Sequence, residues 1–152
     1  MLPQELIRAA AKVLQDKGWA QPPGGRNDHA FDHAGAPIPL WGNTRSGETV
    51  DTSRAQVNPN AAAYSIYGAI VAAKLGETVP AMGLVWDTLY RVGMERNGVA
   101  TGGTNYVHPI IEFNNAEGRT KEEAIAFLED VAKVIDGLTG VDTTVDTDMV
   151  AS

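Results

Sequence analysis

The stretch NPNAAAYSIYGAIVAAKLG, residues 58–76, decides the fold class. Asn58 or Asn60 can cap a helix, Pro59 suits its first turn, and Gly76 can take the left-handed conformation that ends one. Between these signals, apolar and small residues occupy nearly every side of the helix, as they do in a helix that is covered by neighbours. We therefore predict a central helix around residues 64–73, whose small side chains let other helices approach closely.

Three flanking segments have the spacing of amphipathic helices. The first begins near Pro3 and ends at Gly18, and the second begins at Thr78 or Pro80. The third begins at Thr120, which forms a capping box with Glu123, because each side chain can bond a backbone N–H of the other residue. The sequence thus predicts a mostly α fold, with about four helices around a central small-residue helix.

Two segments depart from this helical pattern. Residues 20–59 hold five of the eight prolines and lack a sustained periodicity, which predicts a long loop. Short extended pieces at residues 37–41 and 48–52, with a turn between them, could form a β-hairpin. The run YVHPIIEF, residues 106–113, has a β-like composition, although its proline excludes an ordinary central strand.

Composition bounds the domain organisation and the partners. The 152 residues fit one globular domain, residues 1–140, followed by an acidic tail, residues 141–152, that we expect to be mobile or bound to a partner. Nineteen acidic and twelve basic residues give a net charge of −7, which disfavours broad binding to nucleic acid or to anionic membranes. The absence of cysteine excludes thiol chemistry. No long apolar run is present, so we expect a cytoplasmic protein without a membrane segment.

Three short motifs carry a family resemblance. KGWAQ (17–21) has a Gly-Trp-x-Gln pattern, YSIYGAI (64–70) has an aromatic residue followed by Gly-Ala, and FNNAEGRT (113–120) is similar to Trp-Asn-Asp-x-x-Gly-Arg-Thr. The chain thereby resembles a family of small uncharacterised domains found in bacteria and their phages. The resemblance implies a mostly helical fold with a small extended element, and it implies no activity. Phe113, Asn115 and Ser65 depart from the family's usual Trp, Asp and Cys, and Asn115 cannot act as a general base.

The FNNAEGRT motif is also the first candidate binding site. Asn114, Arg119, Thr120 and Lys121 could hold a phosphate or carboxylate at the start of the last helix. The alternative is structural: the asparagines make a turn and Thr120 caps the helix, which explains every residue except Arg119.

The run NDHAFDHAG, residues 27–35, is the second candidate. His29, Asp32 and His33 could bind zinc or manganese, with His108 as a distant further ligand, and such a metal could activate water. The neighbouring prolines and glycines favour a loop instead, in which histidines are usually solvated. No cofactor other than this divalent metal is indicated.

The sequence favours a non-enzymatic accessory protein that acts on an unidentified protein partner. Its contact surface would include Phe31, Ile38, Trp41 and Arg45 in the long loop. In a phage this reading includes an inhibitor of a host protein or a minor structural component located in the virion. Two alternatives stay open: a metal-dependent hydrolase or phosphate-ligand protein that uses His29, His33 and Arg119, and a self-assembling structural protein that forms an oligomer.

Overall fold

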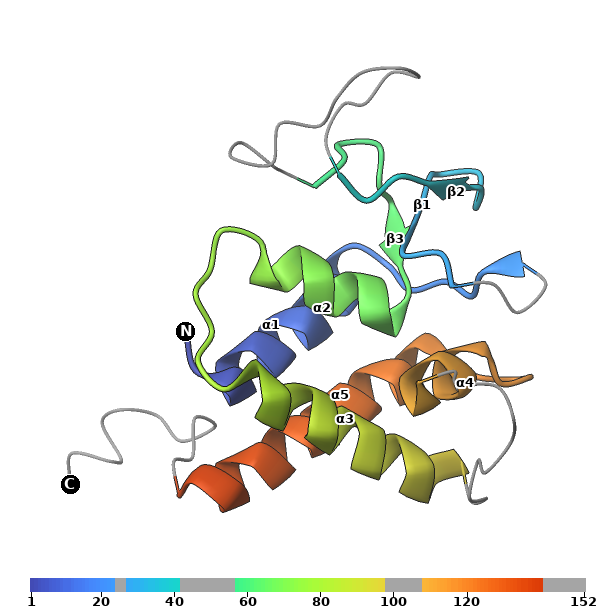
Figure 1. Ribbon diagram of the computed structural model, residues 1–152. Helices are drawn as coiled ribbons and strands as arrows, with labels where there is room; N and C mark the ends of the chain where they lie inside the picture. The colour runs from blue at the N-terminus through green and yellow to red at the C-terminus, as the bar shows by residue number, and fades with distance from the viewer. Residues whose placement is uncertain (24–26, 42–56, 98–107, 141–152) are drawn as a thin grey trace.

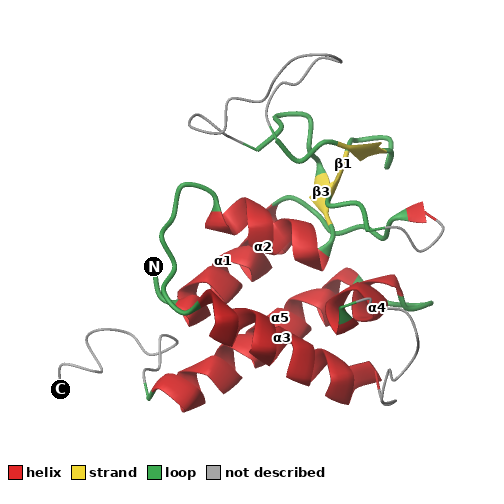
Figure 2. Ribbon diagram, in the orientation of Figure 1, coloured by secondary structure: helices red, strands yellow, loops and turns green. Residues whose placement is uncertain are grey.

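The computed structural model describes residues 1–23, 27–41, 57–97 and 108–140, and its helices dominate the fold (Figure 1, Figure 2). The helices are α1 (Pro3–Asp16), α2 (Ile66–Lys74), α3 (Met82–Asn97), α4 (Pro109–Asn115) and α5 (Lys121–Thr139). The strands are β1 (Ala30–Phe31), β2 (Pro37–Ile38) and β3 (Ala63–Tyr64). The expected mostly α fold is therefore confirmed, with five helices in the described residues where about four were predicted. None of these helices is long and apolar enough to cross a membrane.

The most extensive helix pair is α1 with α5, and α2 packs next against α1. The α1–α5 interface is held at one end by polar contacts. Arg8 forms a bidentate pair with Asp136, at 2.6 and 3.2 Å, and Gln4 Nε2 donates to Thr139 Oγ1 at 3.0 Å. Since early α1 residues meet late α5 residues, the two helices run antiparallel. They bury aliphatic side chains such as Leu6, Leu14 and Leu128 between them and their neighbours.

The small-residue helix α2 is shorter and less covered than predicted. It begins at Ile66, because Ser65 is its N-cap and accepts a hydrogen bond from the Gly68 N–H at 3.0 Å. Asn58 does not cap it: its side chain donates to the Pro39 carbonyl and accepts from the Asn60 N–H. The later half of α2 is only half-buried. The apolar residues before Ser65 enter β3 instead of the helix.

Helix α4 corrects the prediction of an extended segment at residues 106–113. His108 is its N-cap, with Nδ1 accepting from the Ile110 N–H at 3.2 Å, and Pro109 occupies the first turn. A proline is favourable at this position because its missing N–H would have no partner inside the helix. Ile110 and Phe113 then point into the core. Composition suggested a strand, but the His-Pro pair starts a helix.

The small sheet has the strand order β2-β1-β3, and both pairs are antiparallel. Asp32 makes the tight turn between β1 and β2, since its Oδ1 accepts from the N–H groups of Ala34 and Ala36, each at 2.9 Å. Of the extended piece predicted at 37–41, the first two residues form β2 and pair with β1. Its predicted partner, residues 48–52, lies outside the described residues, as do the turn at 42–47 and the tail at 141–152.

Candidate functional site

The side chain of Asn114, at the end of α4, is the centre of a buried hydrogen-bond cluster. Its Oδ1 accepts from the indole Nε1–H of Trp19 at 2.7 Å and from the backbone N–H of Ile66 at 2.9 Å. Its Nδ2 donates to Asn115 Oδ1 at 3.1 Å and more weakly to the Ala20 carbonyl at 3.4 Å. Only 2 % of Asn114 is exposed. The amide therefore fulfils all four of its hydrogen-bonding positions inside the protein.

Gln21 completes the contact between the α1 exit and the end of α4. Its Nε2 donates to the carbonyls of Asn114 and Ala116, at 2.9 and 2.8 Å. The last carbonyls of a helix lack partners within the helix, so this side chain caps α4. All three sequence motifs meet here: KGWAQ supplies Trp19 and Gln21, YSIYGAI supplies the Ile66 N–H, and FNNAEGRT supplies Asn114.

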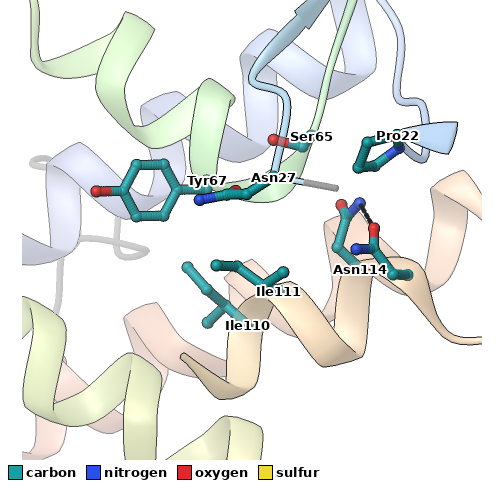
Figure 3. A pocket seen from close by; sticks show the side chains of 8 residues that line it. Pro22, Asn27, Ser65, Tyr67, Ile110, Ile111 and Asn114 are labelled. Atoms are coloured by element: carbon teal, nitrogen blue, oxygen red, sulfur yellow. Dashed lines mark hydrogen bonds between the residues drawn. The ribbon is translucent and has the colours of Figure 1, made fainter. Parts of the chain in front are cut away.

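A small cavity adjoins this cluster. Its volume is about 10 Å³ and its lining includes Asn27, Ser65, Tyr67, Ile110 and Asn114. In Figure 3 the Asn114 amide faces the cavity from α4, and the Tyr67 hydroxyl points away from it. Such a volume is about that of one water-sized sphere. The cavity can accept a single water, and the Asn114 cluster is accordingly a structural joint that is too tight for a substrate.

Gly68 allows the backbone before β1 to lie directly on α2. A Cβ at this position would stand 1.9 Å from the His29 carbonyl oxygen. The Ser65 N–H donates to the same carbonyl at 3.2 Å. The small residues of α2 thus admit an extended segment, whereas the sequence had suggested a helix as the close neighbour.

Arg119 makes three contacts, two with Phe113 of its own motif and one with Glu123 on α5. Its Nε donates to the Phe113 carbonyl at 2.9 Å, its Nη1 pairs with Glu123 at 2.9 Å, and its guanidinium lies 3.7 Å from the centre of the Phe113 ring. The last contact is a cation–π interaction. The sequence left Arg119 as the one residue that turn and cap did not explain. The structure gives it the role of joining α4 to α5.

The other predicted anion-binding residues also have internal contacts. Thr120 caps α5 by accepting from the Glu123 N–H at 3.2 Å, while Glu123 Oε1 accepts from the Thr120 N–H. The predicted capping box is therefore confirmed. Lys121 Nζ donates to the Gln15 carbonyl at 3.2 Å. Asn114 faces the buried cluster, so the four residues do not converge on one ligand position.

The predicted metal ligands have separate environments. Asp32 forms the β1–β2 turn, His33 is exposed, and His29 stacks on Tyr67 with ring centres 4.7 Å apart. In the part of the chain that the structure describes, no group of three or more His, Asp, Glu or Cys side chains is placed to hold a metal ion. The spacing His-x-x-x-His would put both rings on one face of a helix, but here it lies across a turn.

The predicted contact surface in the long loop is partly core. Phe31 is fully buried, so its side chain is not available to a partner. Ile38 and Trp41 are half-buried and pack against the core. Arg45 lies outside the described residues. Because residues 20–59 have no sustained periodicity, their sequence does not show which side chains are buried, and the tertiary contacts of this segment decide it.

Five partly exposed rings, which we call the aromatic row, form the second notable cluster. The centre-to-centre distances are 4.7 Å for His29–Tyr67, 5.2 Å for Tyr67–Trp86, 5.9 Å for Trp86–His108 and 5.7 Å for His108–Tyr90. The first two pairs are stacked and the last two are edge-to-face, which are the favourable geometries for aromatic rings. No sequence signal predicted this row, because its members come from four separate segments.

Burial changes the protonation of both histidines in the aromatic row. Desolvation lowers the pKa of His29 below its ordinary value of 6.5, and the nearby charge of Asp28 opposes this effect. Desolvation also lowers the pKa of His108, against an opposing backbone hydrogen bond with Trp86. His29 Nδ1 is also buried and makes no hydrogen bond to the described residues, so burial favours the neutral form of this ring.

Neither the comparison with curated proteins nor the comparison with solved structures gave a match. The model of a family of unknown function, DUF6197, matches residues 1–134, which include all three motifs and the helices from α1 to most of α5. The chain therefore belongs to the family of unknown function DUF6197.

Proposed function

We propose that this protein is a non-enzymatic accessory protein that binds a protein partner through the aromatic row. The observation that carries the proposal is the row itself: five rings from four segments contact one another in sequence, and each ring is at least partly exposed. Tyr90, at its end, is 50 % exposed. Tyrosine and tryptophan are enriched in protein interfaces, where they often provide much of the binding energy.

The row is well suited to binding because its rings are already ordered. Trp86 and Tyr90 lie on α3, Tyr67 lies on α2, and His108 is fixed as the N-cap of α4. Stacking between these elements restricts the side chains before any partner arrives. A partner then needs to order fewer side chains, which lowers the entropic cost of association.

The chemistry of the row favours a basic partner. The faces of aromatic rings attract arginine and lysine side chains, and the chain carries a net charge of −7. Long-range attraction would speed the encounter, and cation–π contacts at Trp86 and Tyr90 would hold the complex. A second copy of this chain is the alternative partner, and it corresponds to self-assembly.

The test uses a photo-crosslinking amino acid in the full chain. It replaces Tyr90 in one protein and the exposed Lys12 in the control, which lies on α1 outside the aromatic row. We expect a defined protein adduct from position 90 and none from position 12, and we expect Trp86→Ala to abolish the adduct while the helical CD spectrum is retained. Equal adducts at both positions, or no adduct at position 90, would refute the proposal. An adduct between two copies of this chain would contradict a separate protein partner and support self-assembly instead.

A further inference from the structure

A second surface feature, independent of the aromatic row, is a hollow between α3, α4 and α5. Its volume is about 200 Å³. Two ion pairs stand at its sides, Arg119 with Glu123 and Arg96 with Asp130. The buried rings of Phe113 and Phe127, stacked at 4.5 Å, line it from the core side. The hollow thus combines charged walls with an apolar floor.

The unused hydrogen-bonding capacity of the hollow consists mainly of donors. Both oxygens of Glu123 are engaged, one by Arg119 and the other by Thr120. Arg119 uses Nε and Nη1, and its Nη2 makes no hydrogen bond to the described residues. Within the described part of the chain Arg96 bonds through Nη2 alone, toward Asp130, and its side chain is 50 % exposed. The two guanidinium groups can therefore still donate to a ligand.

Arg119 is also rigid before a ligand binds. Its side chain is only 17 % exposed and is fixed by a carbonyl, a carboxylate and the Phe113 ring. A guanidinium that is already oriented loses little conformational entropy when it binds a carboxylate.

We propose that this hollow binds a carboxylate attached to an apolar group. The carboxylate lies between Arg96 and Arg119, and the apolar group lies against Phe127 and Ala126. A monoanion fits better than a phosphate dianion, because Glu123 and Asp130 line the same hollow and repel a second negative charge. Two sources supply this chemistry, a free small aromatic or aliphatic acid and the C-terminal carboxylate of an apolar peptide.

The test is an NMR titration of the full chain with benzoate, with neutral benzamide and with inorganic phosphate as comparisons. We expect benzoate at millimolar concentrations to shift the amide signals of Ala126 and Phe127, with weaker effects from the other two compounds. Absence of these shifts, or equal shifts with benzamide, would overturn the proposal. A peptide ending in phenylalanine with a free carboxylate that binds more tightly than benzoate, and more tightly than its amidated form, would identify a protein source.

Two variants test the geometry. Arg96→Gln should weaken benzoate binding at least threefold, whereas Lys12→Gln, which also removes one cation from a surface ion pair, should leave it unchanged. Asp130→Asn should strengthen binding, because it removes a repelling charge and frees Arg96. Equal effects of Arg96→Gln and Lys12→Gln, or weaker binding by Asp130→Asn, would contradict the placement of the carboxylate.

Discussion

The indole Nε1–H of Trp19 donates a 2.7 Å hydrogen bond to Asn114 Oδ1, across 95 positions of the chain. The same oxygen accepts from the N–H of Ile66, the first residue of α2. One side-chain amide thus fixes the exit of α1, the start of α2 and the end of α4 relative to one another. Asn114, which the sequence offered as an anion-binding residue, therefore has a structural role in joining these three segments.

Asn114→Ala should destabilise the protein by about 3 kcal/mol, because it leaves the Trp19 and Ile66 donors without their acceptor in a buried position. The free energy of unfolding from urea denaturation measures this effect. Asn60→Ala, at an exposed position, is the matched control and should change stability by less than about 0.5 kcal/mol. Equal losses of unfolding free energy in the two variants would show that the Asn114 hydrogen bonds do not stabilise the protein.

Gly68→Ala should be severely destabilising, because the added Cβ would lie 1.9 Å from the His29 carbonyl oxygen, which must then move away from α2. Gly137→Ala is the control, since it also lies within a helix and its Cβ would meet no atom within 4 Å. That variant should stabilise the protein by about 0.5–1 kcal/mol through helix propensity. Thermal unfolding of both variants provides the comparison, and a tolerated Gly68→Ala would contradict the close approach.

Thr120→Ala should cost about 1 kcal/mol, because the Glu123 N–H at the start of α5 loses its acceptor. Thr120→Ser keeps the hydroxyl oxygen and should recover most of this loss. Urea denaturation of the two variants beside the parent chain measures the difference. Identical stability of the Ala and Ser variants would indicate that water replaces the cap.

Glu123 should make stability depend on pH in the acid range. The hydrogen bonds from Arg119, first, and from Thr120 hold the pKa of Glu123 below its ordinary value of 4.5. A lowered folded-state pKa stabilises the protein above 4.5, and this contribution disappears as pH falls through the folded-state pKa. Glu123→Gln should therefore be less stable than the parent chain at pH 7, and the difference should shrink in acid. A constant difference at every pH would exclude this linkage.

The histidines of the aromatic row should add a second pH dependence. Because burial lowers the pKa of His29 and His108 below 6.5, the unfolded chain takes up protons before the folded protein does. Stability should fall as pH drops from about 6.5 toward the folded-state pKa values, and the loss should then level off. His29→Phe keeps a ring against Tyr67 and removes one titrating group, so its stability curve should be flatter in this range. An unchanged curve would show that His29 titrates similarly in both states.

Local signals predicted some elements well. Helix α5 begins where the Thr120–Glu123 capping box placed it, because that box depends only on residues three positions apart. Helix α4 was missed because the apolar composition of 106–113 resembles a strand, while its conformation is set by Pro109 in the first turn and by burial of Ile110. The start of α2 was misplaced for a related reason: Ala63 and Tyr64 could continue the helix toward its N-terminus, yet their pairing with β1 holds them extended as β3.

The sequence by itself determined the mostly α class, the acidic surface charge and the capped start of α5, since these follow from composition and from contacts within one helical turn. Only the tertiary structure decided which partners the motif residues contact. Trp19, Ile66 and Asn114 meet through packing of distant segments, and the aromatic row and the Arg96–Arg119 hollow arise in the same way. Side-chain chemistry says what a residue can bond, but the partner that burial brings within 3 Å decides which bond forms.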